Sequence, residues 1–140
     1  MKSIVVPIKI ISLENDSFHL LVEIVVFKET HWAVLDTGAS RSVFDKNFME
    51  KHLPILRIEE ESQAATIFST NQTVVGEIPS WQIGRLTLSN YTAIGLDLSG
   101  VSDTYQTLGH PAIKAIIGGD ILMQNHAKID YKKATLRFYR

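Results

Sequence analysis

Runs of β-branched and aromatic residues dominate the first part of the chain and are separated by short polar stretches. Two of these runs, residues 4–11 and 18–27, flank the sequence Glu-Asn-Asp-Ser, whose residue types favour a turn. This pattern predicts a β-hairpin. A third apolar run, residues 32–35, predicts a strand that ends at the sequence Asp-Thr-Gly, residues 36–38.

A short helix is predicted directly after this third strand. Asp45 is a residue type that caps the N-terminus of helices, and Lys-Asn-Phe-Met-Glu-Lys-His follows it. Proline lacks the backbone N–H that a helix interior uses, so Pro54 ends the segment. We therefore expect a helix between Asp45 and Pro54.

The middle of the chain has the short segments and turn residues that are typical of antiparallel sheets. Residues 63–77 indicate two strands around a turn at residues 69–73, which predicts an exposed hairpin. Three further short strands are expected around Trp81, around Leu86 and at residues 91–96. The chain is therefore predicted to be mostly β.

Residues 97–111 are the longest stretch without a regular pattern, which predicts a surface loop. The apolar run at residues 115–117 then predicts a buried strand, followed by a double glycine, a short helix and a closing hairpin that turns near Lys132. Together the segments predict an all-β fold with one or two short helices, in a single domain over residues 1–140.

Composition and charge narrow the classes of function. Hydrophobic residues make up 45% and charged residues 21% of the 140 residues, which is typical of a folded soluble domain. The net charge of -1 gives no field that would attract nucleic acid or anionic lipid. No window approaches the roughly 18 consecutive apolar residues of a membrane span. We therefore expect neither nucleic acid nor a membrane as a partner.

The absence of cysteine excludes disulfides, thiolate catalysis and thiolate metal sites. Pro7 and Lys9 interrupt the first apolar run and no small-residue cleavage site follows, so we interpret this run as a strand rather than a signal peptide. On these grounds we expect a cytoplasmic protein. The five histidines lack the spacing of a zinc site, and no metal or other cofactor is expected.

Asp36 places one carboxylate where an apolar strand turns on Gly38. Aspartate before glycine is common in Asx-type turns, which is one interpretation of this residue. Catalysis is the other. Burial disfavours the charged form of a lone carboxylate, but two aspartates about 3 Å apart share one proton. One of them can then take a proton from water while the other donates a hydrogen bond to a peptide carbonyl.

The sequence Ala-Val-Leu-Asp-Thr-Gly-Ala-Ser, residues 33–40, resembles the catalytic signature of the retropepsin-like aspartic proteases. The later segment Ala-Ile-Ile-Gly-Gly-Asp-Ile-Leu-Met-Gln-Asn, residues 115–125, is similar to the hydrophobic-hydrophobic-Gly segment that passes behind the catalytic loop in that family. The likeness covers most of residues 24–139. It implies a closed acid-protease barrel of the retropepsin type and an aspartic endopeptidase that cleaves peptide or protein substrates.

The resemblance also implies a role for each residue of the Asp-Thr-Gly turn. Chains of this family supply one aspartate each to a shared site, so a homodimer is expected, with Asp36 as the catalytic acid/base. Thr37 would lock the two loops together by hydrogen bonds across the dimer axis, and the Gly38 backbone would approach the substrate or the partner loop. Ser40 would hydrogen-bond within the loop, and Ala39 would be small because the turn packs closely.

The predicted hairpin at residues 63–77 corresponds in this family to a flap over the substrate, with Ile67, Phe68, Ser69 and Thr70 near its tip. Phe68 would either cover substrate or fill a face of the hairpin. The tip carries none of the glycines typical of viral flaps. This feature motivates an alternative function, a non-catalytic peptide-binding or assembly module on the same fold.

Asp120 has two interpretations. It could be a second catalytic aspartate within the same chain, or the N-cap of the helix that follows the double glycine, and its position before Ile-Leu-Met-Gln-Asn favours the N-cap. Gly119, just before it, stands where viral members of the family commonly carry an arginine. Ser40 and Ser42 do not indicate a serine hydrolase, because no glycine-flanked nucleophile elbow surrounds either of them.

Overall fold

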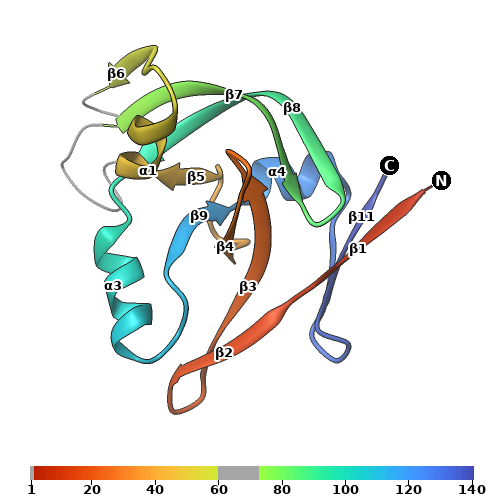
Figure 1. The fold of residues 1–140 in the computed structure, drawn as a ribbon. Helices are drawn as coiled ribbons and strands as arrows, with labels where there is room; N and C mark the ends of the chain where they lie inside the picture. The colour runs from red at the N-terminus through yellow and green to blue at the C-terminus, as the bar shows by residue number, and fades with distance from the viewer. Residues whose placement is uncertain (1, 60–72) are drawn as a thin grey trace.

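The computed structural model describes residues 2–59 and 73–140, which form a mostly β fold with three short helices (Figure 1). Six strands are consecutive hydrogen-bonded neighbours, and the pairing of the first with the last closes them into a barrel. In order around the barrel they are β3 (Ser17–Val26), β4 (Glu29–Leu35), β9 (Ile113–Ile117), β5 (Val43–Asp45), β8 (Leu86–Leu96) and β7 (Thr73–Ile83). The predicted all-β closed barrel is confirmed, with three helices in the described residues instead of one or two.

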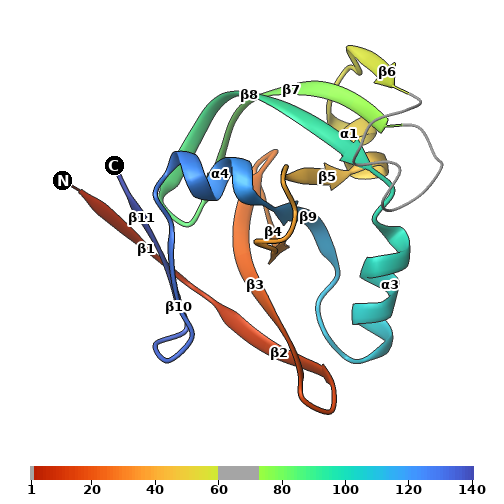
Figure 2. The ribbon, with the colours of Figure 1, turned by 180° about the vertical axis from the view of Figure 1, so that it is seen from behind.

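Two further strands extend the barrel sheet, and three others form a separate sheet. Strand β2 (Lys9–Glu14) pairs with β3, and β6 (Arg57–Glu59) pairs with β7. The separate sheet has the order β1 (Ser3–Pro7), β11 (Thr135–Tyr139) and β10 (Lys128–Asp130). Figure 2 shows the two termini close together at one end of this sheet.

The three helices are α1 (Lys46–His52), α3 (Ser99–Thr107) and α4 (Gly119–Gln124). Helix α4 follows β9 directly and leads to the last hairpin, whose turn near Lys132 is confirmed. Within the described part of the chain, none of the helices is both long and apolar enough to cross a bilayer.

Strand β4 separates two apolar clusters, because successive side chains along a strand point to opposite faces. Ala33 and Leu35 belong to the larger cluster. Val34 lies between them and belongs to the second cluster, to which α3 contributes Tyr105. Asp36 is two residues beyond Val34, so the same alternation directs its side chain toward the second cluster.

The single strand predicted for residues 4–11 is wrong, because the structure divides it into β1 and β2. Ile8 separates the two strands, and its N–H donates to the carbonyl oxygen of Ala134 at 2.8 Å. Strand β1 pairs with β11, whereas β2 pairs with β3. The hairpin predicted around Glu-Asn-Asp-Ser is confirmed as β2–β3.

The three short strands predicted for residues 81–96 are also wrong. The structure has two long strands, β7 and β8, with 11 residues each and one continuous antiparallel register. A turn at Gly84, with a φ of +55, joins these two strands. Strand β8 continues through Asn90, which adopts a φ of 52, and asparagine tolerates this conformation better than most residues.

The loop predicted for residues 97–111 is wrong, since most of this segment forms α3. Leu98, Val101 and Tyr105 are spaced three and four places apart and contact the second apolar cluster. The many Ser, Gly and Thr residues of the segment have low helix propensity and hid this spacing. Tertiary packing therefore decided the conformation.

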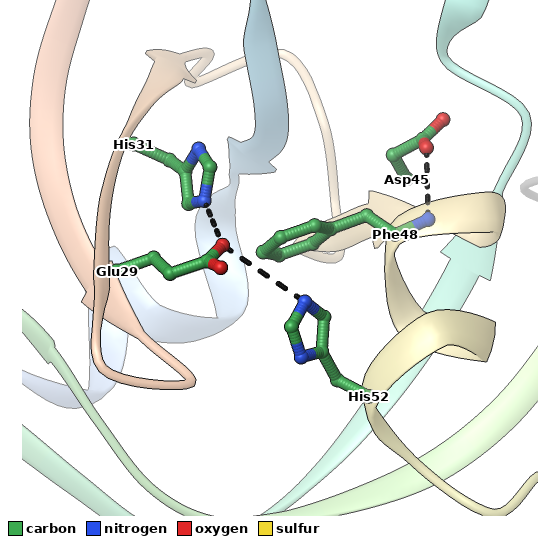
Figure 3. A network of polar contacts seen from close by, with 5 residues as sticks. All are labelled: Glu29, His31, Asp45, Phe48 and His52. Carbon is green, nitrogen blue, oxygen red and sulfur yellow. Dashed lines mark hydrogen bonds and ion pairs between the residues drawn. The ribbon is translucent and has the colours of Figure 1, made fainter.

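Helix α1 begins as predicted, with Asp45 as its N-cap. Asp45 Oδ2 accepts from the N–H of Phe48 at 3.1 Å, and Oδ1 accepts from the N–H of Leu98 at 2.9 Å, just before α3. Figure 3 shows this cap beside a second polar contact, in which Glu29 Oε1 lies 2.8 Å from His31 Nε2 and 3.9 Å from His52 Nε2. These contacts attach α1 to β4 and to the start of α3.

The predicted flap lies mostly outside the described residues, and this includes Ile67, Phe68, Ser69 and Thr70. The described strands on either side, β6 and β7, are antiparallel neighbours, with Glu59 opposite Thr73.

Candidate active site

The backbone holds Asp36 in a tight turn at the end of β4. Its N–H donates to the carbonyl oxygen of Ile117 at 2.9 Å, and its own carbonyl accepts from the N–H of Ala39 at 3.2 Å. Carboxylate Oδ1 accepts from the N–H of Gly38 at 2.9 Å. The Asx-type turn is therefore present, and it fixes the direction of the half-buried carboxylate.

The turn is attached from behind to the junction between β9 and α4. The N–H of Gly119 donates to the carbonyl oxygen of Ala39 at 2.7 Å, and the N–H of Asp120 donates to that of Ser40 at 3.2 Å. A Cβ atom on Gly118 would lie 2.6 Å from the Ala39 carbonyl oxygen, so the double glycine permits this close approach. The two sequence motifs thus meet in space and support each other.

Asp120 does not cap α4, and the N-cap prediction is wrong because Gly118 occupies that position. Asp120 Oδ1 accepts from the N–H and the hydroxyl of Ser42 at 2.8 and 2.7 Å. The Ser42 hydroxyl in turn accepts from the N–H of Gly118 at 2.8 Å. Asp120 therefore anchors the far end of the Asp36 loop.

Tyr91 completes this anchor from β8. Its hydroxyl donates to Asp120 Oδ2 at 3.3 Å. Burial raises the pKa of Tyr91, and the negative charge of Asp120 raises it further. The phenol consequently stays protonated and available as a donor, so both oxygens of Asp120 are engaged in holding the loop.

The remaining residues of the predicted catalytic loop lie at its outer surface. Thr37, Gly38 and Ser40 are exposed, while Ala39 is half-buried against the second apolar cluster. Ser40 does bond within the site, but through its carbonyl oxygen. The loop tip that the resemblance assigns to dimer contact is thus uncovered in the single chain. Within residues 2–59 and 73–140 no group of three or more His, Cys, Asp or Glu residues could hold a metal ion.

Two residues of this region, His19 and Tyr105, were not predicted from the sequence. Strand β3 pairs with β4 up to Leu20 opposite Leu35, so His19 and Asp36 come next in the register. His19 Nδ1 lies 2.6 Å from the hydroxyl of Tyr105, which is 3% exposed. Burial raises the pKa of Tyr105, and the negative charge of Asp36 adds to this effect. The alternation of side chains along β2, β3 and β4 could have indicated His19 from the sequence. Tyr105 could not have been found in this way, because its position depends on α3, which was predicted as a loop.

The closed barrel, with an Asp-Thr-Gly turn braced by a Gly-Gly segment, is the retropepsin-like fold. A sequence model of the aspartyl protease family matches residues 22–121, and the chain belongs to this family. A comparison with curated protein sequences found no significant match.

Two solved structures share the fold. The crystal structure of a retropepsin-like aspartic protease from Rickettsia conorii is similar with a TM-score of 0.58 and 18% identity, over 99% of this chain and 91% of that chain. The crystal structure of the retroviral protease-like domain of Ddi1 from Leishmania major is similar with a TM-score of 0.54 and 17% identity, over 84% and 86% of the two chains. At such low identity the likeness concerns the fold, and the predicted retropepsin-like architecture is confirmed.

Proposed function

We propose that this protein is an aspartic endopeptidase in which Asp36 residues from two copies of the chain form one active site. The observation that carries the proposal is the Asp36 turn itself. Its carboxylate is fixed through Oδ1 and the loop is anchored from behind, while Thr37 and Gly38 are exposed. A rigid carboxylate on an uncovered loop suits a site that a second copy completes.

The proposed chemistry needs one proton shared by the two carboxylates. The ionised carboxylate takes a proton from a water molecule, whose oxygen attacks the carbonyl carbon of the scissile bond. The protonated carboxyl donates to the carbonyl oxygen and stabilises the tetrahedral intermediate. Proton transfer to the amide nitrogen then allows the C–N bond to break. The peptide would bind as an extended strand between the two chains.

A second aspartate from the same chain is a poor alternative. Asp120 is the candidate that the sequence offers, but both of its carboxylate oxygens accept hydrogen bonds, one from Ser42 and the other from Tyr91. A carboxylate that anchors a loop in this way is not free to exchange a proton with substrate. This supports a dimer as the source of the second carboxylate.

The proposal is tested by the substitution Asp36→Asn. We expect cleavage of a peptide library to fall by at least about a thousandfold, because an amide cannot share the proton. Circular dichroism and sedimentation should remain those of the parent protein. Asp103→Asn, at an exposed position of α3, is the matched control and should retain activity. Undiminished hydrolysis in Asp36→Asn would contradict the mechanism. Peptide binding without cleavage by the parent protein would instead indicate the non-catalytic module.

A further inference from the structure

His19 and Asp36 lie on the same face of the barrel sheet. The last β3–β4 pair is Leu20 with Leu35, and continuing this register by one residue places His19 opposite Asp36. Directly opposite residues on antiparallel strands have Cβ atoms about 4.5–5.5 Å apart. Leu21 and Val34, two residues back on each strand, both belong to the second apolar cluster. Tyr105 belongs to the same cluster, its hydroxyl contacts His19, and the negative charge of Asp36 acts on it.

Tyr105 fixes the orientation of the His19 ring. The hydroxyl lies 2.6 Å from Nδ1, and the two rings form an edge contact with centroids 5.5 Å apart. Because Nδ1 faces Tyr105, Nε2 is the ring nitrogen on the opposite side of the imidazole. His110, after α3, adds a second contact to the same hairpin through Nε2, 2.9 Å from the carbonyl oxygen of Ser12. Helix α3 is thus attached to the β2–β3 hairpin beside Asp36.

Two other charged side chains, those of Lys9 and Glu23, lie on this face of β2 and β3. Lys9 on β2 places its ammonium group 5.5 Å from the centre of the Trp32 ring. Glu23 on β3 is exposed and lies opposite Trp32 in the register. Continued beyond Leu20 and Leu35, the β3–β4 register brings Asp36 next to His19. Helix α3 contributes Tyr105 to the second cluster, whereas Asp103 of the same helix is exposed.

We propose that His19, oriented by Tyr105, is a positioning residue whose imidazolium charge stabilises the ionised carboxylate of the Asp36 pair and extends cleavage to lower pH. This inference rests on the proposed protease function. Below about pH 6.5 a histidine carries a positive charge in its ordinary state. The charge favours loss of the first proton from the carboxylate pair, so one carboxylate stays ionised to a lower pH.

The test is the pH profile of kcat/KM for His19→Gln, which keeps a polar side chain and removes the charge. We expect the acid limb to move to higher pH by about one unit, which corresponds to one charge acting over several ångströms near a protein surface. Tyr105→Phe should move it in the same direction by less. His126→Gln, at an exposed histidine after α4, is the matched control and should leave the profile unchanged. An acid limb in His19→Gln that coincides with the parent profile would overturn the proposal.

A second measurement needs no catalysis and separates failure of this inference from failure of the proposed function. Asp36→Asn removes the negative charge that raises the pKa of Tyr105, so ionisation of Tyr105, followed by tyrosinate absorbance against Tyr105→Phe, should shift to lower pH. Unchanged ionisation of Tyr105 in this variant would show that Asp36 is not coupled to the His19–Tyr105 pair. Coupling in a protein that cleaves no peptide would refute only the protease function.

Discussion

At Gly118 the backbone passes directly behind the loop that carries Asp36. A Cβ atom there would lie 2.6 Å from the carbonyl oxygen of Ala39 and 3.0 Å from that of Arg41. Both neighbours are backbone atoms, which cannot move aside as a flexible side chain can. The N–H of Gly118 also donates to Ser42. The position of the Asp36 turn therefore depends on the absence of a side chain at this residue.

Gly118→Ala tests this dependence. We expect a loss of about 1–3 kcal/mol in the free energy of unfolding, measured with urea, because the added methyl group overpacks the loop. Peptide cleavage should fall as the Asp36 turn shifts. Gly100→Ala is the matched control, since nothing lies within 4 Å of a Cβ there and alanine favours the helix. We expect that variant to gain about 0.5 kcal/mol. Equal stability of the two variants would contradict the argument.

Among the elements, α1 and α3 share one buried anchor. Asp45 is 8% exposed and accepts from the N–H of Phe48 in α1 and from the N–H of Leu98 before α3. Helix α1 has only seven residues, too few to be stable alone in water. One carboxylate thus fixes two helices that are distant in sequence, and α3 carries Tyr105 to the side of Asp36.

Asp45→Ala should lower the free energy of unfolding by about 2–4 kcal/mol, because it leaves two buried N–H groups without their acceptor. Asp97→Ala removes an exposed carboxylate that accepts from the N–H of Ser99 at 2.9 Å, and it should cost less than about 1 kcal/mol. Urea unfolding measures both. A difference within experimental error would show that Asp45 is not the shared anchor.

For the whole molecule, the described chain presents one Asp36 loop with an uncovered tip. If two copies complete the site, the fraction of active protein depends on concentration. The loop is held rigidly by α4 and β9 in the single chain, so association would need little rearrangement there.

We therefore expect specific activity to fall on dilution, in parallel with the dimer fraction measured by analytical ultracentrifugation. Asp36→Asn mixed in excess with the parent chain should suppress activity further, because mixed pairs hold a single aspartate. Constant specific activity from a protein that sediments as a monomer at every concentration would rule out the shared site.

Residues with local roles were predictable from the sequence. The cap at Asp45 and the turn at Asp36 involve partners within three residues, so their residue types alone indicate them. The likeness to retropepsin-like proteases added the link between the Asp-Thr-Gly turn and the Gly-Gly segment. Helix α3 was missed because its stability comes from contacts with the second cluster, which local propensity does not contain.

The sequence by itself determined the class of fold, the position of Asp36 and the glycines that allow the loop to pack. Only the tertiary structure decided that Asp120 anchors the loop, that β1 leaves the barrel, and that His19 meets Tyr105 beside Asp36. Ser42 and Asp120 are 78 residues apart, and His19 and Tyr105 are 86 apart. Such pairs form only when barrel closure brings distant strands together, and no local pattern of residue types encodes that approach.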